Sequence, residues 1–155
     1  MASDTAEFGL HKEKVLTGMV LAIDPSSGSY NRKTREQSHL GYALFKAGEL
    51  VDSGIIAMDG KNKTIWERLR DLHDCLSSEF EAPDVLVIEK LRGAFAHDYL
   101  KWSVGVIGTA IRAPVTLEMN ISTWKSRAGK DYVKSDEADA IWIGRALLKI
   151  CRDGV

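Results

Sequence analysis

The architecture of this chain can be worked out from residues 15–25, which read Val-Leu-Thr-Gly-Met-Val-Leu-Ala-Ile-Asp-Pro. An apolar run of this length, closed by Asp24-Pro25, is typical of a buried strand that ends abruptly. Two further apolar runs, residues 41–45 and 51–58, lie on either side of a Lys-Ala-Gly turn and predict a β-hairpin. The first part of the chain therefore predicts three antiparallel strands.

The rest of the chain alternates helices and strands. Thr64 and Glu67 have the spacing of a capping box, which predicts the start of a helix, and Pro83 marks its end. After it we expect, in order, a strand at 84–88, a helix at 96–111, a strand at 114–119, a basic loop at 124–134 and a helix at 135–151. This order predicts an α/β fold in which a mixed five-stranded sheet, its first three strands antiparallel, is flanked by helices.

Length and composition are those of a folded globular protein. With 155 residues, 45% of them hydrophobic, the chain predicts one compact domain over residues 14–155, preceded by a flexible tail at 1–13. The tail does not resemble a signal peptide, and no segment has the roughly 20 apolar residues of a membrane span. Cys75 and Cys151 do not suggest a disulfide framework or a zinc site, which favours reduced thiols in the cytoplasm. The net charge of −1 neither favours nor excludes nucleic acid as a partner.

Four acidic residues stand where elements are expected to end or begin. Asp24 closes the first strand, Glu89 closes the fourth, and Asp136 and Asp139 share the opening turn of the last helix. Because sites in open α/β sheets gather at the carboxyl ends of strands, these carboxylates are candidates for one cluster. Crowded carboxylates repel one another unless a cation neutralises them, and Mg²⁺ and Mn²⁺ prefer oxygen ligands. A pair of such ions suits the hydrolysis of a phosphodiester.

The same acids also have structural interpretations. Asp24 before Pro25 is a common turn pair, and acids at a helix start such as Asp136 and Asp139 are stabilised by the helix dipole. Glu89, directly after a buried apolar run, is harder to explain by turn chemistry. Their joint occurrence at the ends of the expected elements favours the metal site.

Three segments stand out as motifs. They are Leu-Ala-Ile-Asp-Pro-Ser at 21–26 with Gly-Tyr-Ala-Leu-Phe at 41–45, Val-Ile-Glu-Lys at 87–90, and Ser-Asp-Glu-Ala-Asp-Ala at 135–140. In this order they resemble the motifs of the RuvC family of Holliday junction resolvases, the last one especially its phage-encoded members. The resemblance spans most of residues 18–150, although only these motifs are specific.

The resemblance implies an RNase H-like nuclease fold, with two Mg²⁺ ions per active site, or Mn²⁺ in their place. It implies a homodimer acting on four-way DNA junctions in recombination and repair, its interface formed by the helix at 96–111. A two-fold dimer suits a junction because two symmetric cuts are needed. Glu137 is the reserve ligand if the last helix is rotated. The implied catalytic metal ligands are Asp24, Glu89, Asp136 and Asp139.

Basic residues near the motifs are candidates for DNA contacts. The segment between Asp24 and Gly41 is longer than in bacterial RuvC and carries Arg32, Lys33 and Arg35, which either grip phosphates or form a solvated hairpin tip. The segment from 125 to 136 is shorter than in bacterial RuvC, so sequence preference at the cut does not carry over. The expected phosphate contacts there are Lys125, which matches a family lysine, and Lys130, with Arg127 and Lys134 as alternatives.

Aromatic residues have two interpretations each. Phe95 either wedges into a junction or packs at a helix start. Trp66, Trp102 and Trp142 are expected in the core or at the dimer interface, whereas Trp124 beside a lysine is the tryptophan that we expect to face DNA.

The leading expectation is a Mg²⁺-dependent junction-resolving endonuclease. A general debranching nuclease of the same fold, acting on forks, flaps and three-way branches, is the nearest alternative. A non-catalytic junction-binding module is disfavoured by the presence of all four acids, and an RNase H for RNA–DNA hybrids is disfavoured by the motifs. An actin-like or sugar-kinase-like ATPase needs two such domains, for which the chain is too short.

Overall fold

A five-stranded sheet in the order β5-β4-β1-β6-β7 forms the centre of the computed structural model, which describes residues 4–91 and 98–154. The strands are β1 (Met19–Asp24), β4 (Leu40–Lys46), β5 (Glu49–Ile56), β6 (Val85–Glu89) and β7 (Val115–Met119). Antiparallel pairing joins β1 to β4 and β4 to β5, and parallel pairing joins β1 to β6 and β6 to β7. The predicted mixed sheet, with its first three strands antiparallel, is confirmed.

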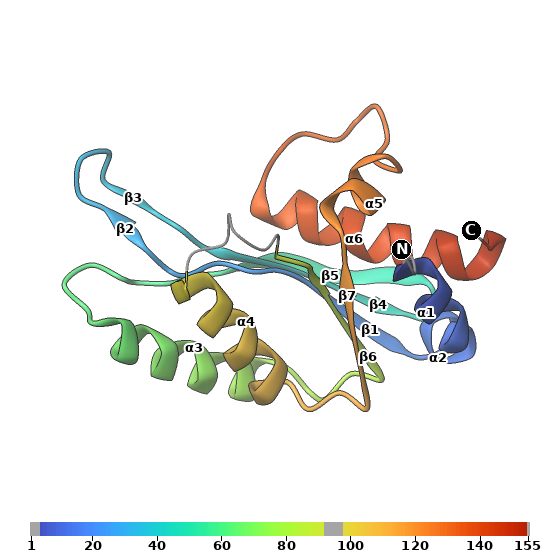
Figure 1. Cartoon of the computed structure of the whole chain (residues 1–155), viewed down its shortest axis with the longest axis horizontal. Coiled ribbons are helices and arrows are strands. Elements are labelled where there is room, and N and C mark those ends of the chain that lie inside the picture. The colour runs from blue at the N-terminus through green and yellow to red at the C-terminus, as the bar shows by residue number, and fades with distance from the viewer. Residues whose placement is uncertain (1–3, 92–97, 155) are drawn as a thin grey trace.

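Helices cover both faces of the sheet (Figure 1). They are α1 (Asp4–Leu10), α2 (Lys12–Thr17), α3 (Ile65–Glu79), α4 (Asp98–Ala110), α5 (Ile121–Lys125) and α6 (Asp136–Asp153). One face packs against α3 and α4, and the other packs against α6. Along β1, Val20 and Ala22 are buried on the α6 side, and Leu21 and Ile23 on the α3–α4 side. Burial on both faces explains why this strand is a continuous apolar run without alternation.

The N-terminal segment differs from the flexible tail expected for residues 1–13. Residues 4–17 form α1 and α2, and the predicted strand starts at Met19 rather than Val15. Phe8 and Val15 are both fully buried in the core on the α6 side. The Cys151 thiol of α6 donates a hydrogen bond to the Phe8 carbonyl oxygen (3.6 Å). The two helices are short and bury only a few side chains. The sequence therefore shows no helical repeat of apolar residues from which they could be predicted.

The predicted basic segment after β1 contains a small two-stranded ribbon. We call it the β2–β3 ribbon, formed by β2 (Tyr30–Asn31) and β3 (Glu36–Gln37). The Asn31 side-chain oxygen accepts hydrogen bonds from the backbone N–H groups of Lys33 (3.0 Å) and Thr34 (3.3 Å), which closes the turn. The ribbon projects from the sheet on the side where α3 and α6 begin (Figure 1).

The remaining elements follow the predicted order. The capping box of α3 is confirmed, because Thr64 and Glu67 exchange side-chain and backbone hydrogen bonds. Helix α5 was not expected, and α4 is described only from Asp98, so the predicted start at 96 lies outside the described residues. None of the helices in residues 4–91 and 98–154 has the length and apolar character needed to cross a bilayer.

Candidate active site

The acids at the ends of β1 and β6 leave the sheet from the same edge. These strands are parallel neighbours in register, with Ile23 opposite Ile88, so Asp24 and Glu89 emerge beside each other. Helix α6 packs across β1 and β4 and begins with Asp136, one turn before Asp139. Ser135 caps this helix by accepting the Ala138 backbone N–H (3.0 Å). Strand register and a capped helix therefore bring together all four predicted acids.

A glycine on β4 allows the start of α6 to reach Asp24. Gly41 lies opposite Asp24 in the β1–β4 pairing. A Cβ atom at position 41 would lie 1.9 Å from the backbone oxygen of Asp136, so any side chain there would push α6 away. The missing side chain at Gly41 thus sets the distance between the strand acid and the helix acids.

Burial and mutual repulsion make Asp24 a weak acid. Burial first, and then the charges of Glu89, Asp139 and Asp136, together raise the pKa of Asp24 from 3.8 to about 8. Asp136 shares a side-chain hydrogen bond with Asp24, and its pKa is raised first by burial and then by Asp139. Without a cation, the cluster holds protons at neutral pH that isolated carboxyl groups would release.

Glu89 is oriented by a buried tryptophan. The Trp124 indole N–H donates a hydrogen bond to Glu89 Oε2 (2.7 Å), and the Trp124 side chain is fully buried in the core. The expectation that Trp124 faces DNA is therefore wrong. Burial raises the pKa of Glu89, while the Trp124 hydrogen bond and the charge of Lys125 oppose that rise. The Lys125 side chain therefore lies close enough to Glu89 for its charge to lower the pKa of that acid.

Tyr132 is a second aromatic partner that the sequence did not reveal. Its hydroxyl donates a hydrogen bond to Asp139, and its ring packs edge-on against Trp124. Burial and the acids around it raise the pKa of Tyr132. Asp139 is therefore fixed by a donor from the loop before α6. The residue pattern gave no signal for this pairing, because the loop was identified only by its basic residues.

His39 is the third neighbour of the acids. Its charged form lowers the pKa of Asp136, and its Nδ1 accepts the Met58 backbone N–H (3.0 Å). When neutral, His39 therefore carries its proton on Nε2.

Glu137, the reserve ligand, faces a different partner. Its carboxylate accepts a hydrogen bond from the Ser53 hydroxyl of β5 (2.7 Å).

The donor chemistry of the cluster fits a hard divalent cation. The cluster consists of four carboxylates without a sulfur or imidazole ligand, which is the ligand set that Mg²⁺ and Mn²⁺ prefer. Burial and neighbouring acids raise the pKa values of Asp24, Glu89 and Asp136. As the side chains stand, no three His, Cys, Asp or Glu residues in the described parts of the chain are arranged as ligands of one ion. Glu89 and Asp139 are turned toward Trp124 and Tyr132.

The predicted DNA-binding residues fall into separate regions. Arg32, Lys33 and Arg35 are exposed on or beside the β2–β3 ribbon. Lys125 lies over the Trp124 ring at 5.8 Å, and Lys130 is exposed in the following loop. Arg127 instead donates to the Thr123 carbonyl oxygen (2.8 Å) and lines a groove between α6 and the β4–β5 turn. Phe95 lies outside the described residues.

Of the other three tryptophans, only Trp142 packs against the core, as expected. Trp66 of α3 and Trp102 of α4 are 58% and 41% exposed and stack on each other at 5.4 Å. Trp142 is half-buried, with the Arg145 guanidinium over its ring at 5.0 Å.

Solved structures of RuvC share this fold. Thermus thermophilus RuvC in complex with a Holliday junction substrate superposes with a TM-score of 0.66 at 15% identity, covering 88% of this chain and 96% of that chain. A second Thermus thermophilus RuvC structure gives a TM-score of 0.64 at 17% identity with the same coverage. No protein-family model and no curated protein matches the sequence. The RuvC-type resemblance is confirmed for the fold, and nothing supports the phage-like qualifier.

Proposed function

We propose that this protein is a Mg²⁺-dependent, structure-selective DNA endonuclease that resolves Holliday junctions. The observation that carries the proposal is the cluster of Asp24, Glu89, Asp136 and Asp139, which the RuvC-type fold brings to one edge of the sheet. An acid whose pKa is raised to about 8 by burial and by three other acids is a costly arrangement in the absence of a cation. Such an arrangement is expected where function requires it.

Each residue of the site has a role in this proposal. Asp24 and Asp136 would hold metal between the strand end and the helix start, with Glu89 and Asp139 completing the set. When bound, a pair of Mg²⁺ ions activates the attacking water and stabilises the leaving 3′ oxygen of a phosphodiester. Trp124 positions Glu89, and Lys125 lies where its charge would meet the phosphate. Burial of Asp24 limits the access of other water molecules.

Branched DNA is the proposed substrate, because one of the RuvC structures of the same fold holds a Holliday junction substrate. A homodimer is the proposed assembly, since a symmetric junction needs two equivalent cuts. The exposed, stacked pair of Trp66 and Trp102, with Tyr99 beside it, offers an aromatic surface on α3 and α4 for the second copy. The cytoplasm is the proposed compartment.

Cleavage of defined DNA structures tests the proposal. A labelled four-way junction, a three-way branch and a linear duplex would be incubated with the protein in Mg²⁺ or in EDTA. Asp24→Asn removes the charge that a hard cation needs, and Asp153→Asn at the opposite end of α6 is the control. We expect paired, symmetric, Mg²⁺-dependent cuts in the four-way junction for wild type and control only. DNA binding without cutting under any divalent metal would leave a non-catalytic junction-binding module.

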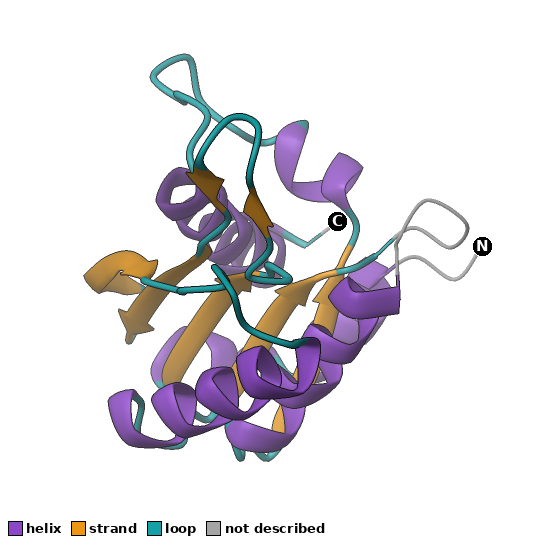
Figure 2. Cartoon of the chain, turned by 90° about the vertical axis from the view of Figure 1, so that its left-hand side faces the viewer, coloured by secondary structure: helices purple, strands orange, loops and turns teal. Residues whose placement is uncertain are grey.

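A general debranching nuclease is the second candidate. The β2–β3 ribbon projects away from the five-stranded sheet (Figure 2) and follows Asp24 in the chain. It favours this candidate because it would offer contacts to DNA arms of varied geometry. Equal cutting of three-way and four-way branches would establish it in place of the resolvase.

A further inference from the structure

A basic groove lies between the β2–β3 ribbon and the start of α3. Its volume is about 520 Å³, and its charged lining residues are Arg32, Lys61, Lys63 and Arg68. None of the residues that line it is acidic. Only Arg32 among these was predicted to contact DNA, because the other three come from the segment after β5 and from α3. The fold thus gathers cations that lie far apart in the sequence.

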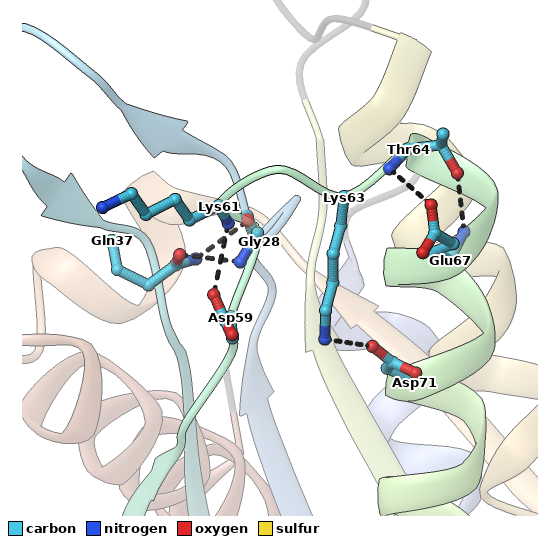
Figure 3. Close-up of polar contacts among 9 residues, drawn as sticks. Gly28, Gln37, Asp59, Lys61, Lys63, Thr64, Glu67 and Asp71 are labelled. Carbon is cyan, nitrogen blue, oxygen red and sulfur yellow. Dashed lines mark hydrogen bonds and ion pairs between the residues drawn. The ribbon is translucent and has the colours of Figure 1, made fainter.

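The two walls of the groove are fastened to each other (Figure 3). Gln37 of the ribbon donates from Nε2 to the Gly28 carbonyl oxygen (2.8 Å) and accepts the Gly60 backbone N–H at Oε1 (2.8 Å). A Cβ atom at position 60 would lie 2.1 Å from the Gly28 oxygen, so this close approach requires glycine. The ribbon and the loop before α3 therefore form one built surface.

The cations of the groove differ in what they already contact. Lys63 is paired with Asp71 (2.7 Å), which offsets its charge. The Arg68 guanidinium donates to the Ser27 carbonyl oxygen (3.0 Å) and so ties α3 to the segment that leaves Asp24. Lys61 is exposed and lies over the Tyr30 ring at 5.6 Å, and Arg32 is exposed on the ribbon side. Arg32 and Lys61 are thus the cations best placed to meet a ligand.

The groove adjoins the carboxylate cluster through the backbone. The ribbon follows Asp24 at the end of β1 and returns to His39, which acts on Asp136. A DNA strand that leaves the acids on this side would therefore meet the ribbon that forms one wall of the groove. Exposed cations with a half-buried tyrosine are the combination that tracks a nucleic-acid backbone.

We propose that this groove binds the sugar–phosphate backbone of a DNA arm adjacent to the strand that is held for cutting. The proposal rests on the function proposed above and adds Lys61 and Arg68 to the DNA-binding surface. In it, Arg32 and Lys61 contact phosphates, and Arg68 positions the wall of the groove. Such contacts fix the orientation of an arm without reading its sequence.

Junction binding in EDTA, where no cutting occurs, tests the groove separately from the nuclease activity. The probe is a fluorescently labelled four-way junction, titrated by anisotropy at several salt concentrations. The test variant is Arg32→Gln with Lys61→Gln. Its charge-matched control is Lys149→Gln with Arg152→Gln, in the other basic groove beside α6. A conservative pair, Arg32→Lys with Lys61→Arg, keeps both charges, and thermal melts check that all variants fold.

We expect the test variant to bind about tenfold more weakly than wild type. The slope of log affinity against log salt should fall by about 1.8, at about 0.9 for each lost phosphate contact. The control should change binding by less than about twofold, and the conservative pair should bind as wild type does. Equal weakening in test variant and control, or no weakening, would overturn the groove proposal.

The outcomes separate the two proposals. Wild type that cuts junctions while the test variant binds normally refutes the groove alone. Groove-dependent binding without Mg²⁺-dependent cutting refutes the nuclease alone. Wild type that binds no junction, duplex or single strand refutes both.

Discussion

Asp84 and Asp24 lie at opposite ends of the β1–β6 strand pair, and their surroundings differ. At the amino end, Asp84 stands before β6 and accepts the Met19 backbone N–H (2.7 Å), while its own N–H donates to the Met19 carbonyl oxygen (2.9 Å). At the carboxyl end, Asp24 faces Glu89, Asp136 and Asp139, and its pKa is raised to about 8. One acid completes the backbone hydrogen bonding, and the other is surrounded by like charge.

This difference in surroundings distinguishes an acid that stabilises the fold from an acid that is placed for catalysis. A carboxylate that accepts a backbone N–H contributes to stability with no further partner. A buried carboxylate among three others opposes folding until a cation arrives. Sequence position alone does not separate them, because both acids flank an apolar run.

The largest expected effect comes from removing the charge of each acid in turn. Asp24→Asn should reduce Mg²⁺-dependent cleavage of a four-way junction at least about a thousandfold, because a ligand of the catalytic cation is lost. Asp84→Asn should leave the cleavage rate within about twofold of wild type. Single-turnover rates on the same labelled junction give the comparison. Similar losses in both variants would erase the distinction between the two ends.

In the absence of metal, Asp24→Asn should increase the stability of the fold, although it abolishes cleavage. The raised pKa means that folded Asp24 keeps its proton between pH 3.8, where the unfolded group ionises, and about 8. The free energy of unfolding should therefore fall as pH rises through this window and level off above it. Asp24→Asn removes the effect, so in EDTA at pH 8 it should be more stable than wild type by up to about 5 kcal/mol, at about 1.4 kcal/mol for each pKa unit.

Urea unfolding in EDTA at a series of pH values measures this difference. The gain should shrink as the pH falls toward 3.8 and vanish at about pH 3, where Asp24 is protonated in both states. Adding Mg²⁺ should stabilise wild type and leave Asp24→Asn unchanged. A variant less stable than wild type at pH 8 would contradict the burial and repulsion assigned to Asp24.

Trp124 gives Glu89 a donor, much as Met19 does for Asp84. Trp124→Phe keeps an aromatic ring in the core and loses the N–H that holds Glu89 Oε2. We expect Mg²⁺ affinity, measured by calorimetry, to weaken about tenfold, as for other groups that orient metal ligands. Trp142→Phe, on a half-buried residue of α6, is the control and should bind Mg²⁺ like wild type. Unchanged affinity in both would remove the positioning role of Trp124.

The smallest effect is expected at the amino end. Asp84→Ala removes the acceptor of the Met19 N–H. Because this N–H lies near the surface, it can donate to water instead. Unfolding free energy should fall by about 1 kcal/mol, with metal affinity unchanged. Urea titration of the variant beside wild type gives the value, and a loss of Mg²⁺ binding would show that the two ends are coupled.

The sequence predicted those features that depend on local pattern. The main strands and helices in their order along the chain, the capping box at Thr64 and the acids at element ends all leave a signal within a few residues, and the structure contains each of them. Bringing Asp24, Glu89 and the α6 acids together needed only the order of the elements and the rules of parallel sheets.

The features that were missed depend on contacts across the fold. Phe8 and Val15 bury two short helices against α6, with no repeat long enough to read. Trp124 precedes a lysine in the sequence, yet its own side chain turns into the core toward Glu89. The groove near Arg32 depends on the Gln37 bridge between segments that are far apart along the chain. Neither the burial of one tryptophan nor a bridge between two loops can be read from neighbouring residues.

Gly41 shows that a position with no functional group can be as intolerant of change as a catalytic one. Its absent side chain lets the Asp136 backbone rest against β4, opposite Asp24. In a library that samples every substitution, position 41 would be selected as strictly as the acids, although it never touches a substrate. Evolutionary substitution in this protein is therefore limited by the functional groups of the site and also by the space that the absent Gly41 side chain leaves, about the size of one methyl group.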